Sequence, residues 1–539
     1  MNHSLSRSLR FLLPIALVAG LPACGGGGAP PASAPFVATF PNEGPGGGGP
    51  LPPIVLPAPA LPQAPVWVED AVPLGRTALF GSFPSDVVAF DGTVFTTDAD
   101  GIEGGGAVVL PVDVSGPAPH PSLRYAPFTL FAHDLVDSQG RPGDANAPLG
   151  FGFYLNDLAV VAPDLGFALA NAGGSDSAPT LSNLVVFDPE QGTLLQVVDL
   201  ANPVGPAGGP YLDSTGAALP GNAFTQSGAE GLEFVPTGQG RGRLYVAMSN
   251  LLFAAPSYGA VKCPGTVQVF DVDASRTPRV TLRPAGAFAT ETWITKGYNP
   301  VAISRVSATF APDRLLVTVA GTTGYDASFA LVPKTASSVE VYDSASAAYL
   351  GAFDLGLVGL SASRPALGTD QAGHAVAYFA SSVRGEVYAL RIDGLTGYGV
   401  DASRVAVLRG LHNPIPIDPA AAGGPGGNVA GLALSSDGRT LVATGFGDLF
   451  AFPAKPGRIY AISLPPDVVA TSGFGQVLVH GTSNLVSTSG RTLGPVVLVT
   501  SPGGGPELYV TVSGTVDLAT GLGSSDASLG SLQTFGAIR

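Results

Sequence analysis

One repeated pattern constrains the fold of this 539-residue chain more than any other feature. Each copy has an apolar strand, a turn rich in Asp, Pro and Gly, a second apolar strand, and a third strand of the form G-x-V-x-V-[FY]-D. A clear copy opens with "GNVAGLALSSDGRTLVATGFG" at 427–447. Seven copies follow one another at spacings of 64–74 residues, with first strands beginning at Asp86, Asn156, Glu230, Asn299, Arg364, Asn428 and Leu493.

The repeat predicts an all-β fold. The copies contain short strands separated by turn residues, without the sustained 3.6-residue periodicity of an amphipathic helix. Seven four-stranded meanders leave unpaired edges unless the chain closes on itself, and a β-propeller provides that closure. We expect a single seven-bladed β-propeller at residues 66–539, behind a signal peptide and a disordered Gly/Pro-rich linker. The alternative is a stack of sandwich domains, which predicts clear linkers between the units.

The last copy indicates how the ring closes. Its segment "GSLQTFGAI" (530–538) supplies a late strand, as "GTVQVFDV" (265–272) does in an earlier copy. We expect this strand to pair beside strands from the N-terminal segment, so that both ends of the propeller meet in one blade.

The N-terminus reads as a targeting segment, not as part of the fold. Arg7 and Arg10 precede the apolar run "FLLPIALVAG" (11–20), which is too short to span a bilayer. The next residues, "LPAC" (21–24), resemble a bacterial lipobox. That resemblance implies a lipoprotein signal peptide at 1–23 and a diacylglycerol on Cys24. An ordinary signal peptide cleaved near Ala23 is the alternative.

The segment behind Cys24 is predicted to be a linker. Residues 24–65 hold 9 Gly and 12 Pro in 42 positions. A segment of this composition cannot bury enough apolar surface to offset the entropy lost when the chain becomes ordered. The acyl chains would anchor this stalk in a membrane. Gly25 follows the cysteine, and by resemblance to lipoproteins this favours the outer membrane over retention at the inner one. We expect a lipid-anchored cell-envelope protein.

Composition and charge limit the possible partners. Apolar residues make up 45% of the chain, enough for a substantial core, and the net charge of −15 is spread thinly. No Lys/Arg cluster offers the basic surface that phosphates require, so nucleic acid is not expected as a partner. A protein, a glycan or an envelope polymer is compatible with this surface, and we expect a monomer.

The repeats resemble a known class of propellers. "LALSSDGRTLVATG…GRIYAISL", "LYVAMSN…GTVQVFDV" and "LYVTVSG" are similar to the Y-V-T-N repeats of bacterial seven-bladed propellers. That group includes surface-layer repeat proteins, quinoprotein-like propellers and lactonase-like enzymes. The resemblance covers roughly residues 66–539 and implies the fold. It does not imply one function, because propellers serve binding and catalysis alike.

Polar residues at the starts of the first strands are candidates for a site, because the innermost strand of each blade lines the central channel. Converging carboxylate and amide oxygens suit Ca²⁺, which takes 6–8 oxygen ligands. The alternative is that each caps a turn through its own side chain. The candidates are Asp86, Asn156, Asp157, Glu230, Asn299, Arg305 and Asn428.

A second resemblance supports a cation at the channel. "LNDLAVVAPDLGFALAN" (155–171), "GAEGLEFVPTGQGRGRLYVA" (228–247) and "GNVAGLALSSDG" (427–438) resemble the metal-binding strands of the gluconolactonase and paraoxonase families. Those families are six-bladed, and their Glu strand comes first in the chain. The resemblance implies that Ca²⁺ is held by Glu230, Asn156 and Asn428, with Asp86 and Asp157 as additional ligands.

Two further groups are interpreted as solvated. Glu230 and Glu233 lie three positions apart in one strand, so they should point to opposite faces, with Glu233 in solvent. His133 lies beside Asp134 and Asp137 in a Gly/Pro-rich connection, where a solvated loop is favoured over a metal corner.

The sequence leaves two functions open. No G-x-S-x-G elbow, H-E-x-x-H motif or P-loop occurs. We therefore favour a lipid-anchored binding or scaffolding module without catalysis. The alternative is a lactonase-like or esterase-like hydrolase in which a channel cation polarises the ester carbonyl.

Overall fold

The computed structural model shows a protein built almost entirely of short strands. The described part of the chain contains short 3₁₀ turns and no α-helix, and no helix in it could span a bilayer. The predicted signal peptide, Cys24 and the predicted linker lie outside the described residues. The structure describes residues 69–73, 85–98, 107–116, 119–137, 142, 151–173, 181–205, 210–213, 215–252, 260–261, 263–282, 292–306, 313–325, 331–396, 399–400, 406–407, 413–417, 429–445, 458–468, 476–479, 493–500, 506–512, 516–517, 522–523 and 531–535.

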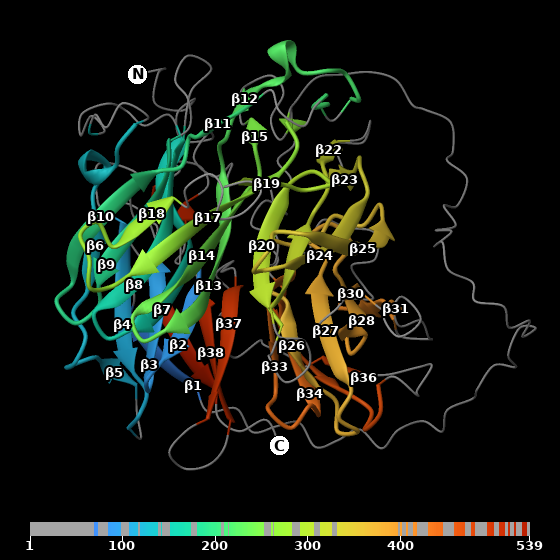
Figure 1. Cartoon of the computed structure of the whole chain (residues 1–539). Helices are drawn as coiled ribbons and strands as arrows, with labels where there is room; N and C mark the ends of the chain where they lie inside the picture. The colour runs from blue at the N-terminus through green and yellow to red at the C-terminus, as the bar shows by residue number, and fades with distance from the viewer. Residues whose placement is uncertain are drawn as a thin grey trace, which may run out of the picture.

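The described strands form four antiparallel sheets of four strands and three of five, together with small two-stranded hairpins (Figure 1). Each of the larger sheets has one strand at the start of a predicted repeat, so the repeat boundaries follow the sheets. These first strands are β2 (Val87–Phe90), β7 (Phe151–Ala162), β13 (Ala229–Gly238), β20 (Pro300–Arg305), β26 (Ala366–Thr369), β33 (Val429–Leu434) and β37 (Leu493–Thr500).

The second, third and outer strands complete each sheet. In three sheets the third strand pairs with two short outer strands, one at each end, because an insertion interrupts the outer edge. In chain order these strands are β3 (Thr93–Asp98), β4 (Ala107–Asp113), β5 (His120–Pro121) and β6 (Phe128–Leu130); β8 (Leu165–Gly173), β9 (Leu181–Asp188) and β10 (Thr193–Asp199); β14 (Arg241–Met248), β17 (Thr266–Asp273), β18 (Val280–Leu282) and β19 (Thr292–Ile294); β21 (Arg314–Val319), β24 (Ser337–Asp343) and β25 (Tyr349–Gly356); β27 (Ala375–Ala380), β28 (Glu386–Arg391), β31 (Ala406–Val407) and β32 (Ile415–Pro416); β34 (Thr440–Gly445), β35 (Arg458–Ser463) and β36 (Gln476–Val479); and β38 (Pro506–Val512), β41 (Ser531–Phe535) and β1 (Glu69–Pro73).

The two ends of the folded chain meet in one sheet, as predicted. β1 pairs antiparallel with β41 from Glu69 opposite Phe535 to Pro73 opposite Ser531, and β41 pairs with β38 (Figure 1). The most N-terminal strand therefore completes the most C-terminal sheet. Since β37 of that sheet also packs against β2, the row of sheets closes on itself. This closure hides the edges that a linear stack would leave open.

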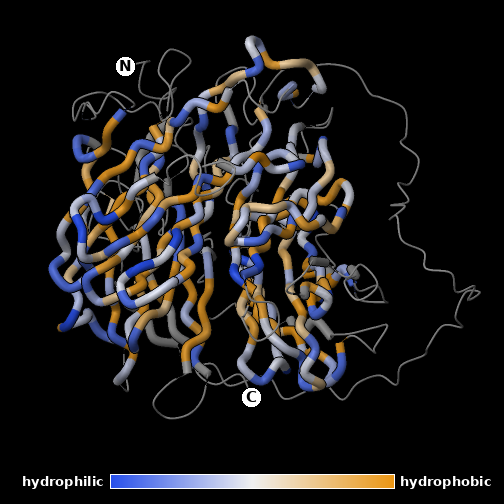
Figure 2. The backbone as a smooth tube through the Cα atoms, viewed as in Figure 1, coloured by the Kyte–Doolittle hydropathy of each residue, from blue (hydrophilic) through white to orange (hydrophobic). Residues whose placement is uncertain are grey.

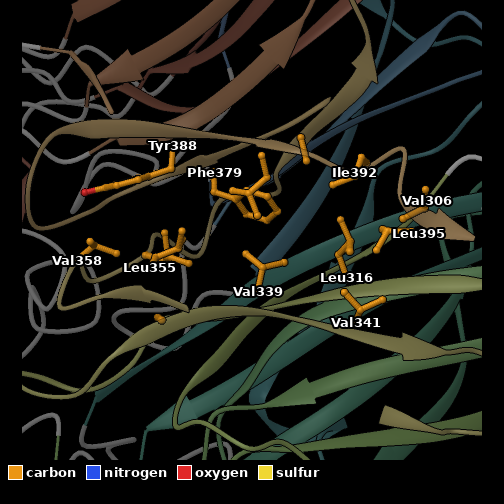
Figure 3. Packing of buried hydrophobic residues seen from close by; sticks show 14 of the residues in the cluster. Val306, Leu316, Val339, Val341, Leu355, Val358, Phe379, Tyr388, Ile392 and Leu395 are labelled. Carbon is orange, nitrogen blue, oxygen red and sulfur yellow. The ribbon is translucent and has the colours of Figure 1, made fainter. Parts of the chain in front are cut away.

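The core lies between successive sheets. Figure 3 shows the layer between the β20–β25 sheet and the β26–β28 sheet, where Leu316, Val339 and Val341 from one sheet pack against Phe379 and Tyr388 from the other. The second strands β21 and β27 are buried along their whole length, and Figure 2 shows apolar stretches running through the interior of the sheets. A closed ring of such layers is a β-propeller, and the sandwich alternative is wrong.

Candidate functional site

Irregular pairing near the start of the first strands shapes the channel entrance. The register shifts between Leu155 and Leu158 in β7 and between Ala229 and Gly231 in β13. Shifts of the same kind occur in β20, β33 and β37. A β-bulge leaves an extra residue unpaired and re-aims the side chains that follow it. The predicted site residues of β7 and β13 lie in these bulges.

Carboxylates at these positions join neighbouring blades. Oδ2 of Asp86 accepts the backbone N–H of Leu158 at 2.8 Å, and Oδ2 of Asp157 accepts that of Leu232 at 2.6 Å. The same bond thus recurs at two successive junctions of the ring. Both aspartates are buried, with 7% and 5% of their surfaces exposed. The first role of these side chains is to hold one blade to the next.

Glycine takes the corresponding position at two other junctions. A Cβ on Gly231 would lie 2.7 Å from the Cα of Ala302, and one on Gly431 would lie 2.9 Å from the backbone nitrogen of Val496. Here the backbones of neighbouring blades touch directly, which a side chain would prevent. The junctions that carry Asp are bridged by hydrogen bonds, and those that carry Gly by close packing.

Asn156 and Glu230 lie together, as the second resemblance implied. Nδ2 of Asn156 donates to Oε2 of Glu230 at 2.6 Å and to the carbonyl of Ala229 at 3.1 Å. The hydroxyl of Ser249 lies 3.5 Å from Oε1 of Glu230. Burial raises the pKa of Glu230 to about 7, although the hydrogen bond from Asn156 opposes the shift.

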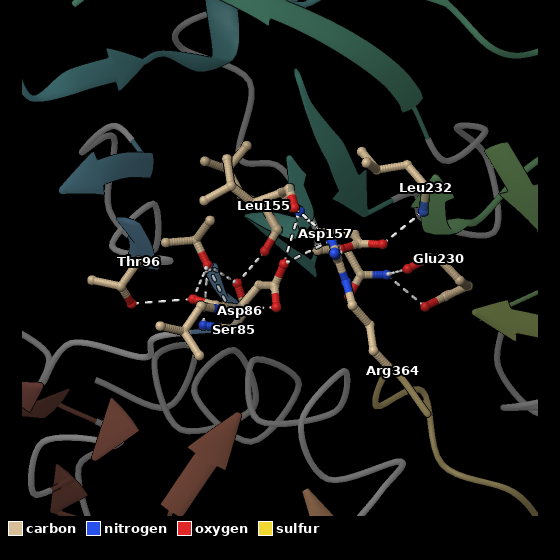
Figure 4. A network of polar contacts seen from close by, with 12 residues as sticks. Ser85, Asp86, Thr96, Leu155, Asp157, Glu230, Leu232 and Arg364 are labelled. Atoms are coloured by element: carbon tan, nitrogen blue, oxygen red, sulfur yellow. Dashed lines mark hydrogen bonds and ion pairs between the residues drawn. The ribbon is translucent and has the colours of Figure 1, made fainter. Parts of the chain in front are cut away.

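Arg364 reaches into this cluster from another part of the ring (Figure 4). Its Nε donates to Oδ1 of Asp157 at 3.1 Å. Its Nη2 donates to Asp157 and to the Leu158 carbonyl, and lies 3.5 Å from Oδ2 of Asp86. Desolvation lowers the pKa of Arg364, but the charges of Asp157 and Asp86 outweigh it and hold that pKa above its usual value. Burial raises the pKa of Asp86 well above normal, with Arg364 opposing.

Glu233 belongs to the same cluster, and the prediction that it is solvated is wrong. The bulge at Glu230 shifts the alternation of side chains between the two faces of β13. Glu230 and Glu233 are three positions apart, but because of this shift they do not point to opposite faces. The Asp157 charge raises the pKa of both carboxyls. Burial raises the pKa of Glu233 to about 7, while Arg364 and Arg305 lower it.

The cluster contains cation-binding oxygens, but they do not form an open cation site. Asp86 and Asp157 accept backbone N–H groups, and the Arg364 guanidinium lies between their carboxylates. The predicted Asn156–Glu230 pair is closed by its own hydrogen bond. In this arrangement the residues do not fit Ca²⁺, because a cation would have to displace a guanidinium that already compensates the same charge.

Other candidates have different positions. Asn428 lies outside the described residues, so its predicted role stays a prediction. Nδ2 of Asn299 donates to the Gly321 carbonyl at 3.1 Å, which is the turn-capping role given as the alternative. His133 is 55% exposed and lies 3.6 Å from Asp134, as expected for a solvated loop.

Sequence reasoning missed two features. The repeat pattern marks Arg364 only as the start of a copy; its signal is a basic residue where five of the six other copies begin with Asn, Asp or Glu. A group formed by Asp370, His374 and Asp467 was also missed, because 93 positions separate His374 from Asp467. Only the packing of adjacent blades brings them together.

The comparisons with known proteins do not assign this chain to a family. No family model matches, and no curated protein does. Similar solved structures include the Cps50 (Swd1) β-propeller domain from Myceliophthora thermophila, with 10% identity over 88% of this chain and 100% of that one and a TM-score of 0.41. A europium-containing methanol dehydrogenase has 11% identity over 86% and 92% of the two chains, with a TM-score of 0.38. The NanB sialidase from Streptococcus pneumoniae has 11% identity over 87% and 70%, with a TM-score of 0.37.

Proposed function

We propose that this chain is a lipid-anchored cell-envelope protein whose β-propeller is a rigid binding or scaffolding module. The observation that carries the proposal is Arg364, whose guanidinium pairs with Asp157 and Asp86 across the channel entrance. These ion pairs join residues from three blades and thereby brace the ring. Partners then bind the outer loops and hairpins of the propeller, and a protein, a glycan or an envelope polymer is the expected class.

The proposed location of the protein at a membrane rests on the sequence alone. "LPAC" (21–24) and the Gly/Pro-rich segment behind it support a lipid anchor and a stalk that holds the propeller away from the bilayer. In Cys24→Ser the protein should leave the membrane fraction and lose the acyl mass on its N-terminal peptide. Unchanged membrane partition together with an unmodified Cys24 in the wild type would contradict the anchor.

The module should neither require calcium nor turn over esters. The full chain is stripped with EDTA, and its melting temperature and hydrolysis of simple lactones are measured with and without Ca²⁺. We expect no calcium-dependent shift and no turnover. In parallel, cross-linking in intact cells should produce a discrete adduct of the full chain. Calcium binding and lactone hydrolysis that both disappear in Glu230→Gln would overturn the proposal.

A metal-dependent hydrolase is the second candidate, and one observation favours it. Asn156 and Glu230 come together from different blades at 2.6 Å, and the pKa of Glu230 is about 7. Under this candidate, Arg364 would have to leave the carboxylates before a cation enters. Removing its charge in Arg364→Met should then increase calcium affinity, whereas under the binding-module proposal it only weakens the fold.

A further inference from the structure

A second group of potential ligands lies at the other end of β26. Arg364 precedes this strand, and Asp370 follows it in the turn that leads to β27. Six residues of extended chain span about 20 Å, so this turn is well separated from the carboxylates at the channel entrance. Asp467 reaches the same place from the neighbouring sheet, in the segment after β35. The group therefore bridges two adjacent blades.

Asp370 is held in one orientation. Its side chain is fully buried, and its Oδ1 accepts the backbone N–H groups of Ala372 and His374 at 3.0 and 2.8 Å. Its Oδ2 accepts the N–H of Val468 from the neighbouring blade at 3.0 Å. Metal ligands that are fixed by such outer hydrogen bonds lose little entropy on binding.

The two other members complete a mixed nitrogen and oxygen set. Nδ1 of His374 lies 3.2 Å from Oδ2 of Asp370 and 3.3 Å from Oδ1 of Asp467. Zinc bonds of about 2.0–2.1 Å place neighbouring tetrahedral ligands about 3.3–3.4 Å apart. Both distances match such an edge, and all three ligand atoms lie within 4.8 Å of one another.

The potential ligand atoms converge on one place. Nδ1 of His374 faces Oδ1 of Asp467 and Oδ2 of Asp370, which also accepts the N–H of Val468. A divalent cation at this point would take the place of the charge of a protonated imidazole between the two carboxylates. His374 and Asp467 are 33% and 36% exposed, which leaves room for entry and for a water as fourth ligand.

We propose that Asp370, His374 and Asp467 bind one divalent transition-metal ion of the zinc class, which clamps the β26–β28 blade to the β33–β36 blade. Imidazole with carboxylate suits Zn²⁺, whereas a calcium site would be built from oxygen alone. The clamp is independent of the proposed binding function and acts on stability. Because the ion would bind the folded chain only, it raises the melting temperature.

The test uses the full chain, stripped with EDTA and titrated with Zn²⁺ and with Co²⁺. We expect one bound ion per chain, a Co²⁺ absorption spectrum of tetrahedral type and a rise in melting temperature. His374→Gln and Asp467→Asn should each weaken Zn²⁺ binding at least tenfold and abolish the rise. Both side chains are partly exposed, so these variants should fold. Asp370 is left intact because it holds backbone groups.

His133→Gln is the matched control, since His133 also lies beside a carboxylate but in an exposed pair. It should bind Zn²⁺ like the wild type. Binding that is absent from the wild type overturns the proposal, and so does binding that both site variants retain. A protonated His374 bridging the two aspartates is the rival explanation. It predicts destabilisation of His374→Gln at acidic pH without any effect of Zn²⁺, and that result would also overturn the metal site.

Discussion

Replacing Glu230 with Gln should change how the stability of the protein depends on pH. The pKa of Glu230 is raised from 4.5 to about 7, chiefly by burial. The folded state therefore retains a proton that the unfolded state releases between these values. The resulting stability is fully present below pH 4.5 and is lost as the pH rises through 7. The wild type should be less stable at pH 8 than at pH 5.

The pKa difference sets the size of the effect. A shift of about 2.5 pH units corresponds to at most about 3.4 kcal/mol at 1.36 kcal/mol per unit. Partial exposure and relaxation reduce this, so we expect about 1–2 kcal/mol. Gln has nearly the same shape, and its carbonyl can still accept the hydrogen bond of Asn156. The substitution removes the charge and little else.

The assay is thermal unfolding of the full chain at several pH values between 5 and 8, in EDTA. At pH 5 the variant and the wild type should unfold at nearly the same temperature, since Glu230 is then protonated in the folded state. At pH 8 the variant should melt higher, by roughly 1–2 °C at about 1 °C per kcal/mol for a chain of this size. Glu190→Gln, at an exposed carboxyl, is the control and should show no such dependence. A variant that is less stable at pH 8, or equally shifted at both pH values, would refute the reasoning.

Three further changes test the ring. Arg364→Met should destabilise the fold by about 2–4 kcal/mol at pH 8, because Asp157 and Asp86 lose their compensating charge, and by less at pH 5; equal losses at both pH values would contradict the charge argument. Gly431→Ala should lower the free energy of unfolding by about 1–3 kcal/mol, measured by chemical denaturation, since its Cβ would lie 2.9 Å from the Val496 nitrogen. Gly216→Ala is the control: its Cβ meets no atom within 4 Å, so it tests the cost of a strained backbone alone. Deleting residues 69–73, which removes β1, should lower the melting temperature by at least 5 °C and expose β41 to hydrogen exchange; rapid exchange of β41 in the intact protein would contradict the closure.

The course of the chain could be predicted because it depends on local pattern. The same local pattern recurs in each sheet: an apolar first strand, a turn with Asp and Gly, and a third strand that ends in Asp. As a result, the predicted repeat starts Asp86, Asn299 and Leu493 all lie at or next to the start of a first strand. The pairing of "GSLQTFGAI" with the N-terminal segment followed from the need to cover an open edge.

The candidate site was predicted only in part. Asp86, Asn156, Asp157 and Glu230 do come together, because first strands share the channel. Their partners could not be inferred. A bulge changes which face a residue occupies. Gly231 in "GAEGLEF" (228–234) is the signal for it, but simple alternation along the strand ignores the bulge and places Glu233 in solvent. The approach of Arg364 to Asp157 joins positions 207 apart in the chain, which only the closed ring determines.

The distribution of these residues around the ring explains why one arginine can brace it. Asp86 and Asp157 lie at successive junctions, whereas Gly231 occupies the next equivalent position and Gly431 one farther along. Negative charge is therefore concentrated on one side of the entrance, while Arg364 reaches in from the β26 blade. An even ring of carboxylates would attract a cation to its centre. An uneven one is compensated by a side chain from another blade, and the bulges that aim Asp157 and Glu230 inward are what make that contact possible.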